Sequence, residues 1–301
     1  MTGAGARTGD GHVVSVVIPT LGRQTIEGTR RALQGQTRPP DEVVEVLDVE
    51  RRGISWARNE GFRQSRGDLV ALTDDDAVPP PDWIERLVGA IDRHDAAAAG
   101  GRFLETDDLL RRKSERKAYP DLESVDTEGW VGNGGNIMIR RAWLDACIAK
   151  DGYVYDESFD MNCGEDHEFV HRIRGRGAKL VFVPNPVMHR RRVTPAGSVA
   201  FQFRRGRGIA HLSEAIRSAG AGPAIPQRGL LFGSGGRGGG ARWAAAFWKK
   251  AIGPFDLSSF AGPGQFAVFW IGEKLEGAGF LFQLTLRRLG GRRTAARDAI
   301  R

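Results

Sequence analysis

Cysteine is scarce in this chain of 301 residues, with only Cys147 and Cys163 present. Two cysteines cannot build the disulfide framework of a small secreted protein, so we expect a reducing compartment. The first twelve residues contain no apolar run, which predicts a disordered lead-in and no signal peptide. Phosphate-loop and dinucleotide-binding patterns are also missing, because no glycine-rich stretch joins a strand to a helix at the required spacing.

Charge is distributed unevenly along the chain. Residues 1–189 carry 25 Lys and Arg against 32 Asp and Glu, a balance of −7, whereas residues 190–301 carry 19 against 5, a balance of +14. Two parts of opposite sign should have different partners. A basic tail can meet phosphates, either of lipids or of nucleic acid.

The apolar patterns predict alternating strands and helices. The β-branched runs predict strands over 12–20, 41–49, 68–73 and 179–189, and the run of small residues over 96–103 could form another. Helical spacing predicts helices over 25–36, 54–65, 81–94 (with Asp82 as N-cap) and 164–177, and beyond 197. This order predicts an α/β fold with a doubly wound sheet that is parallel through its first three strands and has helices on both faces.

Three consecutive carboxylates, Asp74, Asp75 and Asp76, follow the third predicted strand. Ligands of an open parallel sheet bind beyond the carboxyl ends of its strands. Two carboxylates one residue apart can face a common point, where a divalent cation would offset their repulsion and still take phosphate oxygens. The alternatives are a solvated acidic loop, or charges that favour the N-terminus of the next helix.

Further motifs stand around these carboxylates in a definite order. They are IPT, GISWARNEG, DDD followed by PPPDW, GNGGNIMIRR, GEDHEF and VPNPVMH. From about Val13 to His189 this series resembles the family 2 glycosyltransferases, enzymes of the GT-A fold, and in particular bacterial cell-surface polysaccharide or glycolipid glycosyltransferases. The resemblance implies a mostly parallel GT-A sheet, to which we add a C-terminal helical extension.

The resemblance also implies roles for single residues at the donor side. The residues that would bind the nucleotide-sugar donor are Pro19, Thr20, Asp48, Arg58, Asn59 and Asp75. Asp74, Asp76 and His189 would hold a divalent cation, Mg²⁺ or Mn²⁺. The loop after the second strand is shorter than the family usually has, so Glu45 or Glu50 could take the place of Asp48.

The acceptor side involves a carboxylate and a glycine-rich turn. Asp166 matches the family's general base, which takes the proton of the acceptor hydroxyl. Trp130, Gly134, Gly135 and Glu165 are the candidate acceptor-binding residues. For Trp130 a core position, and for Glu165 a helix-capping or Asp166-orienting role, remain open. The glycines indicate close approach of the backbone.

The segment HEFVH, His167 to His171, matches the zinc-protease pattern, in which Glu168 would be the base. A third ligand would be needed, and His189 could supply it only if the strand and turn between them folded back suitably. In the preferred interpretation, Phe169 and Ile173 face the core, and His171 lies at the surface or behind the site.

These observations predict four segments. They are a lead-in (1–12), a GT-A catalytic domain (13–215), a glycine-rich linker (216–240) and a basic amphipathic extension (241–301). The function they predict is inverting, metal-dependent transfer of a sugar from a nucleotide-diphosphate donor to a hydroxyl acceptor, in cell-envelope glycan or glycolipid synthesis. The alternatives are a sugar-phosphate nucleotidyltransferase and an inactive domain whose basic tail binds an acidic polymer.

The expected partners are the donor, a glycan or lipid-linked acceptor and an anionic membrane surface, whereas nucleic acid is not expected. In the tail, Glu273, Lys274 and Glu276 interrupt an apolar cluster, so no uncharged run reaches the ~20 residues of a membrane span. An interfacial helix fits this pattern better and predicts a cytoplasmic protein bound to the inner face of the membrane. Packing of the same residues on the domain or on a second subunit is the alternative.

Overall fold

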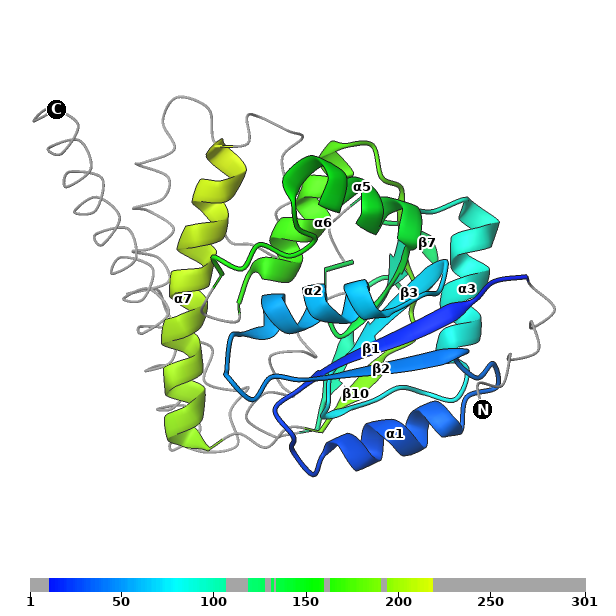
Figure 1. The fold of residues 1–301 in the computed structure, drawn as a ribbon, viewed down its shortest axis with the longest axis horizontal. Coiled ribbons are helices and arrows are strands. Elements are labelled where there is room, and N and C mark those ends of the chain that lie inside the picture. The colour runs from blue at the N-terminus through cyan, green and yellow to red at the C-terminus, as the bar shows by residue number, and fades with distance from the viewer. Residues whose placement is uncertain are drawn as a thin grey trace, which may run out of the picture. The chain divides into compact units, whose positions relative to one another are not determined.

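The computed structural model describes residues 11–106, 119–127, 131–132, 134–159, 163–190 and 194–218 (Figure 1). The chain divides into two compact units. The first comprises Met1–Ser158, Asp166–Arg192 and Ile225–Gly229 and contains the strands, and the second includes the long helix α7 (Pro195–Ser218). The predicted linker and extension, 216–301, lie outside the described residues almost entirely, so the predicted segment boundaries stay predictions.

A seven-stranded sheet forms the centre of the first unit, in the order β2-β1-β3-β8-β5-β9-β7 (Figure 1). Its strands are β1 (Val14–Thr20), β2 (Glu42–Leu47), β3 (Leu69–Thr73), β5 (Ala98–Gly100), β7 (Ser124–Val125), β8 (Asn136–Arg140) and β9 (Leu180–Phe182). As predicted, β1 pairs in parallel with both β2 and β3. β8 runs antiparallel to β3 and β5, and β7 runs antiparallel to β9.

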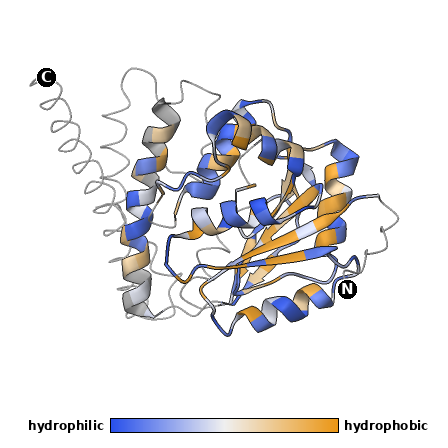
Figure 2. Cartoon of the chain, viewed as in Figure 1, coloured by the Kyte–Doolittle hydropathy of each residue, from blue (hydrophilic) through white to orange (hydrophobic). Residues whose placement is uncertain are grey.

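Helices cover both faces of this sheet, and each face has its own apolar core. The helices are α1 (Ile26–Gln34), α2 (Ile54–Gln64), α3 (Trp83–His94), α5 (Arg141–Asp151) and α6 (Glu165–Gly175). Alternate residues of a strand contribute to opposite cores. In β1, Val17 packs with residues of α2, α5 and α6, whereas Val16 and Ile18 pack with residues of α1 and α3. The central strands β1 and β3 are mostly apolar and buried along their length (Figure 2), as expected where both faces are covered.

The single strand predicted over 179–189 is wrong. The structure has two short strands there: β9 in the large sheet, and β10 (Val187–His189) in a second sheet of order β4-β10-β6. Pro184 and Pro186 stand between them, and proline cannot donate to a strand ladder. The small sheet also contains β4 (Ala77–Val78) and β6 (Phe103–Glu105), neither of which was predicted as a strand of its own.

Asp82 occupies the N-cap position of α3, but its side chain makes no capping hydrogen bond. Instead its carboxylate accepts hydrogen bonds from Asn185 Nδ2, at 3.1 Å, and from Arg86 Nε, at 2.5 Å. Asn185 lies between the two prolines, so this contact ties the β9–β10 turn to the start of α3.

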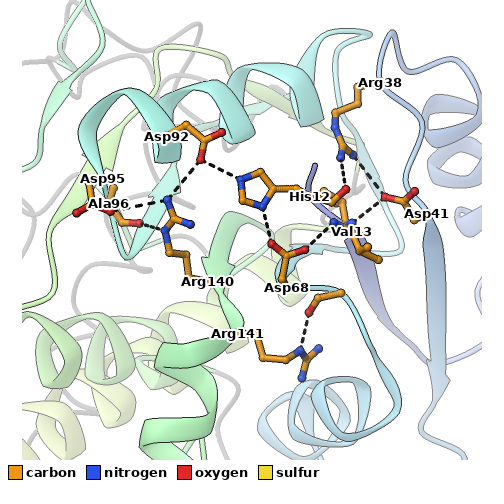
Figure 3. Close-up of polar contacts among 12 residues, drawn as sticks. His12, Val13, Arg38, Asp41, Asp68, Asp92, Asp95, Ala96, Arg140 and Arg141 are labelled. Carbon is orange, nitrogen blue, oxygen red and sulfur yellow. Dashed lines mark hydrogen bonds and ion pairs between the residues drawn. The ribbon is translucent and has the colours of Figure 1, made fainter. Parts of the chain in front are cut away.

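At the amino ends of the strands, His12 joins segments that are distant in sequence (Figure 3). Its Nδ1 lies 2.5 Å from Asp68 Oδ2 and its Nε2 lies 3.0 Å from Asp92 Oδ1 on α3. Arg140 contributes a cation beside Asp92, at 3.4 Å, and the backbone oxygen of His12 accepts a hydrogen bond from Arg38 Nη2. The cluster therefore joins the chain before β1 to the segment before β3 and to α3.

Replacement of His12 by Gln is expected to destabilise the protein at pH 6 and to matter less at pH 9. Burial lowers the pKa of His12, but its hydrogen bonds to Asp68 and Asp92 outweigh burial and raise that pKa above 6.5. A raised histidine pKa stabilises the fold below the unfolded-state pKa, and this stabilisation disappears as pH rises through the folded-state value. Thermal denaturation of both proteins at the two pH values measures the effect, and a pH-independent difference would contradict it.

Candidate active site

The candidate site lies at the carboxyl ends of β1 and β3, neighbouring parallel strands that end at Thr20 and Thr73. Carboxyl ends of parallel strands meet at one edge of a sheet, and ligands bind there. Asp74, Asp75 and Asp76 occupy the turn that leads from β3 into β4. The backbone N–H of Ala77 donates to Asp74 O across this turn, at 3.1 Å.

Asp74, Asp76 and His189 converge, as predicted, with one ligand atom of each lying within 4.8 Å of the others. His189 reaches the turn because β10 pairs antiparallel with β4, which places His189 opposite Ala77. The imidazole Nε2 of His189 lies 2.8 Å from Asp76 Oδ1, and both residues are buried. The small sheet thus carries the third member of the cluster.

Charge is concentrated in this cluster. Burial raises the pKa of Asp74, as do the charges of Asp76 and Asp75, whereas Arg58 and His189 act in the opposite direction. Burial alone lowers the pKa of His189, but its hydrogen bonds to Asp76 and Glu105 raise the pKa to about 10. His189 therefore supplies positive charge among the carboxylates, and a bound cation would supply positive charge at the same place.

The donor set fits a divalent cation. Two carboxylates and one imidazole suit Mg²⁺ or Mn²⁺, with the nitrogen ligand favouring Mn²⁺. Metal binding requires a neutral imidazole, so His189 would release its proton as the cation entered. Asp74, Asp76 and His189 are the residues that would hold the cation.

Asp75 makes other contacts than Asp74 and Asp76. Its Oδ2 accepts a hydrogen bond from Thr20 Oγ1 at 2.7 Å, and Thr20 Oγ1 in turn accepts one from the N–H of Gly22, at 2.9 Å. Arg23 lies 3.5 Å from Asp75 and 3.9 Å from Asp76, and its side chain is 55% exposed. Sequence reasoning missed Arg23, although its place in the loop after β1 puts it at the carboxyl edge.

Asp48 is buried at the end of β2, and its carboxylate closes the loop that follows. Its two oxygens accept hydrogen bonds from the N–H groups of Arg52 and Gly53, both at 2.8 Å. Gly53 precedes α2 and has a φ of 111°, which favours glycine. Through these two contacts, Asp48 ties the end of β2 to the start of α2 across the short loop VERR.

Arg58 and Asn59 are neighbours on α2 with different surroundings. Arg58 is 4% exposed, lies 3.7 Å from Asp74 and stacks over the ring of Tyr155. The Asn59 side chain exchanges two hydrogen bonds of 2.8 Å with the backbone of Tyr155. Arg58 therefore faces the carboxylate cluster, whereas Asn59 holds the segment around Tyr155, whose ring lies under Arg58.

The glycine-rich turn before β8 lies directly on these residues. A Cβ added to Gly134 would lie 2.5 Å from the Arg58 guanidinium, and one added to Gly135 would lie 2.5 Å from Asp74 Oδ2. The N–H of Gly134 donates to Asp166 Oδ2, at 3.2 Å. Two consecutive glycines thus connect Asp166, in the first turn of α6, to the carboxylate cluster, and the predicted close approach of the backbone is confirmed.

Three predicted residues remain: Pro19, Glu165 and Trp130. Pro19 is buried in β1, and Glu165 is buried at the start of α6. Beside these predicted residues, Arg190 directly follows His189; it is exposed, and its backbone N–H donates to Asp76 O, at 2.7 Å. Trp130 lies outside the described residues.

The zinc-protease interpretation is wrong for the described residues. Among them, the group of Asp74, Asp76 and His189 is the one set that could hold a metal, and neither His167 nor His171 belongs to it. Glu168 accepts a hydrogen bond from Arg172, one turn further along α6, at 2.8 Å. Burial and the nearby charge of Arg174 lower the pKa of His171. As predicted, Phe169 and Ile173 are fully buried in the core.

Comparison with known proteins agrees with this geometry. Residues 44–147 match the family model described as glycosyl transferase family 2. This part of the chain is therefore similar to that family, and the match favours a glycosyltransferase over the nucleotidyltransferase alternative.

Two curated relatives extend the match. A glucosyl-dolichyl phosphate glucuronosyltransferase of Haloferax volcanii is 45% identical over 126 residues, which cover 38% of this chain and 38% of that protein. A hyaluronan synthase of Pasteurella multocida is 23% identical over 189 residues, covering 50% of this chain and 19% of that one. This chain thus spans less than two fifths of the length of either relative.

A solved structure supports the fold. The mannosyltransferase PcManGT from Pyrobaculum calidifontis, in complex with GDP-Man and Mn²⁺, superposes with a TM-score of 0.58. It shares 18% sequence identity, and the match covers 91% of this chain and 87% of that one. The predicted GT-A fold is confirmed. Within the described part of this chain, none of the helices has the length and apolar character needed to cross a membrane.

Proposed function

We propose that this protein is an inverting, metal-dependent glycosyltransferase that moves a sugar from a nucleotide-diphosphate donor to a hydroxyl group of an acceptor. The observation that carries the proposal is the junction at Gly134 and Gly135, where a candidate base and a candidate metal site meet. Sugar transfer needs both: a base for the incoming hydroxyl, and positive charge for the departing diphosphate.

Asp166 is the proposed base. Its carboxylate accepts hydrogen bonds from the N–H groups of Gly134 and His167, at 3.2 and 2.8 Å, so its orientation is fixed while it keeps acceptor capacity. It would take the proton of the acceptor hydroxyl as that oxygen attacks the anomeric carbon of the donor. A single displacement of this kind inverts the anomeric configuration.

Asp74, Asp76 and His189 would hold the cation, which supplies charge stabilisation to the leaving diphosphate when bound. Arg58, 3.7 Å from Asp74, balances part of its charge. Arg23 is half-exposed beside Asp75 and Asp76, where its guanidinium can also reach a phosphate.

Pro19, Thr20, Asp48 and Asp75 are proposed to border the nucleoside part of the donor. All four lie at the carboxyl ends of β1, β2 and β3. Asn59, whose amide is engaged by the Tyr155 backbone, would act on the donor through the position of that segment.

The acceptor would lie over the turn formed by Gly134 and Gly135, with Glu165 and Trp130 as further contacts. A lipid-linked acceptor is proposed because the Haloferax volcanii relative is named for glucosyl-dolichyl phosphate. The envelope role and attachment at the inner face of the cell membrane follow from that acceptor and from the basic tail.

The direct test is incubation with a panel of nucleotide-diphosphate sugars and lipid-linked or soluble acceptors, with Mn²⁺ or with chelator. One donor is expected to give product with Mn²⁺ only, and proton NMR is expected to report an anomeric configuration opposite to that of the donor. Product with retained configuration would contradict the assignment of Asp166. Product formed equally well in chelator would contradict the metal site.

Full-length protein is expected to float with liposomes that contain anionic lipid, and a chain ending at Gly220 is expected to remain in the soluble fraction. The reason is the +14 balance after His189, together with the apolar cluster of the tail. Added salt should weaken binding, because the headgroup contacts are electrostatic. Full-length protein that stays soluble at low salt would assign the tail to core packing or dimerisation.

A further inference from the structure

Strand β6 lies next to the candidate metal site without contributing to the metal-binding set. It pairs in parallel with β10, and Glu105 stands opposite His189 in that pairing. Phe103 and Glu105 are two residues apart, so their side chains leave the strand on the same face. Both contact the imidazole of His189.

The imidazole is restrained on three sides. Glu105 Oε1 lies 3.3 Å from Nδ1, and Asp76 Oδ1 lies 2.8 Å from Nε2. The ring of Phe103 stacks on the imidazole, with centroids 4.7 Å apart and planes 26° apart. The side chains of Glu105 and His189 are only 13% and 10% exposed, so solvent competes little for these contacts.

We propose that Glu105 is a positioning residue that holds the His189 ring with Nε2 directed at the cation site. This inference rests on the proposed function, because it presupposes that the cluster binds metal. A metal-binding histidine commonly gives its second ring nitrogen to a carboxylate, which fixes the orientation of the ring. Glu105 occupies that outer position, since the ligand set comprises Asp74, Asp76 and His189.

Phe103 has a second contact that supports this arrangement. A Cβ added to Gly135 would lie 2.7 Å from Phe103 Cζ, so the same ring separates the glycine-rich turn from His189. The stack blocks rotation of the imidazole away from Asp76, while Glu105 selects the orientation within the ring plane. Strand β6 therefore acts on the cation site through His189.

The competing explanation is that Glu105 merely stabilises the β6–β10 pair. The two explanations differ in what Glu105→Ala does to metal binding by folded protein. They also differ in whether Glu105→Gln, which keeps an oxygen acceptor of the same reach, restores that binding.

The test is titration of the full chain with Mn²⁺ alone, followed by the electron paramagnetic resonance signal of the free ion. Glu105→Ala is expected to weaken Mn²⁺ binding about 10- to 100-fold, and Glu105→Gln to stay within about threefold of wild type. Glu123→Ala is the matched control, because Glu123 holds His94 at 3.0 Å in another carboxylate–histidine pair, and it should leave Mn²⁺ affinity unchanged. Melting in chelator reports whether each variant is folded.

A double-mutant cycle shows whether Glu105 acts through His189. In the His189→Ala background, Glu105→Ala is expected to cause no further loss of Mn²⁺ affinity. Equal affinity of wild type and Glu105→Ala, or an undiminished loss in that background, would overturn the inference while leaving the metal site intact. Wild-type protein that binds no Mn²⁺ would instead refute the metal site itself, and the inference with it.

Discussion

Asp166→Asn is expected to lower the rate of sugar transfer about a hundredfold or more while leaving donor binding unchanged. Asparagine has nearly the same shape but cannot take a proton, and general-base catalysis contributes roughly 10²- to 10⁴-fold. The substitution also turns one hydrogen-bond acceptor into a donor next to the N–H groups of Gly134 and His167. The expected structural cost of that mismatch is about 1 kcal/mol, far too little to unfold a domain.

Transfer rates and the dissociation constant of the nucleotide sugar, measured on the same preparation, test this expectation. Asp145→Asn, an exposed carboxylate on α5, is the control and should behave as wild type. Full turnover by Asp166→Asn would remove Asp166 from the mechanism. If Asp166→Asn lost both donor binding and turnover, Asp166 would instead belong to the donor side.

Asp76→Ala is expected to abolish Mn²⁺-dependent donor binding. Asp76 contributes a buried carboxylate to the cluster and is the hydrogen-bond partner of His189 Nε2, so its removal affects two of the three groups. The loss in Mn²⁺ affinity should exceed the roughly 10- to 100-fold that outer-shell partners typically contribute. Calorimetric titration with Mn²⁺ and with the nucleotide diphosphate measures both affinities.

Asp82→Ala provides the control for this experiment. Asp82 also accepts hydrogen bonds in the segment after β3, but it holds Asn185 and Arg86 and lies outside the metal-binding set. It should therefore lower stability without changing Mn²⁺ affinity. A comparable loss of Mn²⁺ affinity in both variants would mean that the segment is disrupted and that Asp76 has no special role.

The centre of the main sheet could be predicted from the sequence because β1 and β3 are strongly apolar on both faces. Val14–Thr20 and Leu69–Thr73 read as buried runs, and the helices after them show clear apolar spacing. Position at the carboxyl ends of these strands then placed Asp74 and Asp76 together. The convergence of His189 on them was expected only through the family resemblance, because the antiparallel pairing of β10 with β4 leaves no signal in so short a strand.

Glu105 and Arg23 could not be found in the same way. Strand β6 has three residues, too few to show periodicity, and its partly buried glutamate reads as an ordinary surface charge until β10 is placed beside it. Arg23 lies in a loop, where spacing carries no information about direction. The role of Asp48 in closing its own loop likewise depends on the positive φ of Gly53, which residue types alone do not reveal.

The central claim is that Asp74, Asp76 and His189 form a metal site that binds a nucleotide-diphosphate donor. It is tested most directly by thermal denaturation of wild type and Asp76→Ala with a panel of nucleotide diphosphates, with and without Mn²⁺. A ligand present at 100 times its dissociation constant stabilises the folded state by about 2.7 kcal/mol, enough for a clear rise in melting temperature. The account predicts such a rise for wild type with one nucleotide and Mn²⁺ together, and none for Asp76→Ala. An equal rise without Mn²⁺, or in Asp76→Ala, would contradict it.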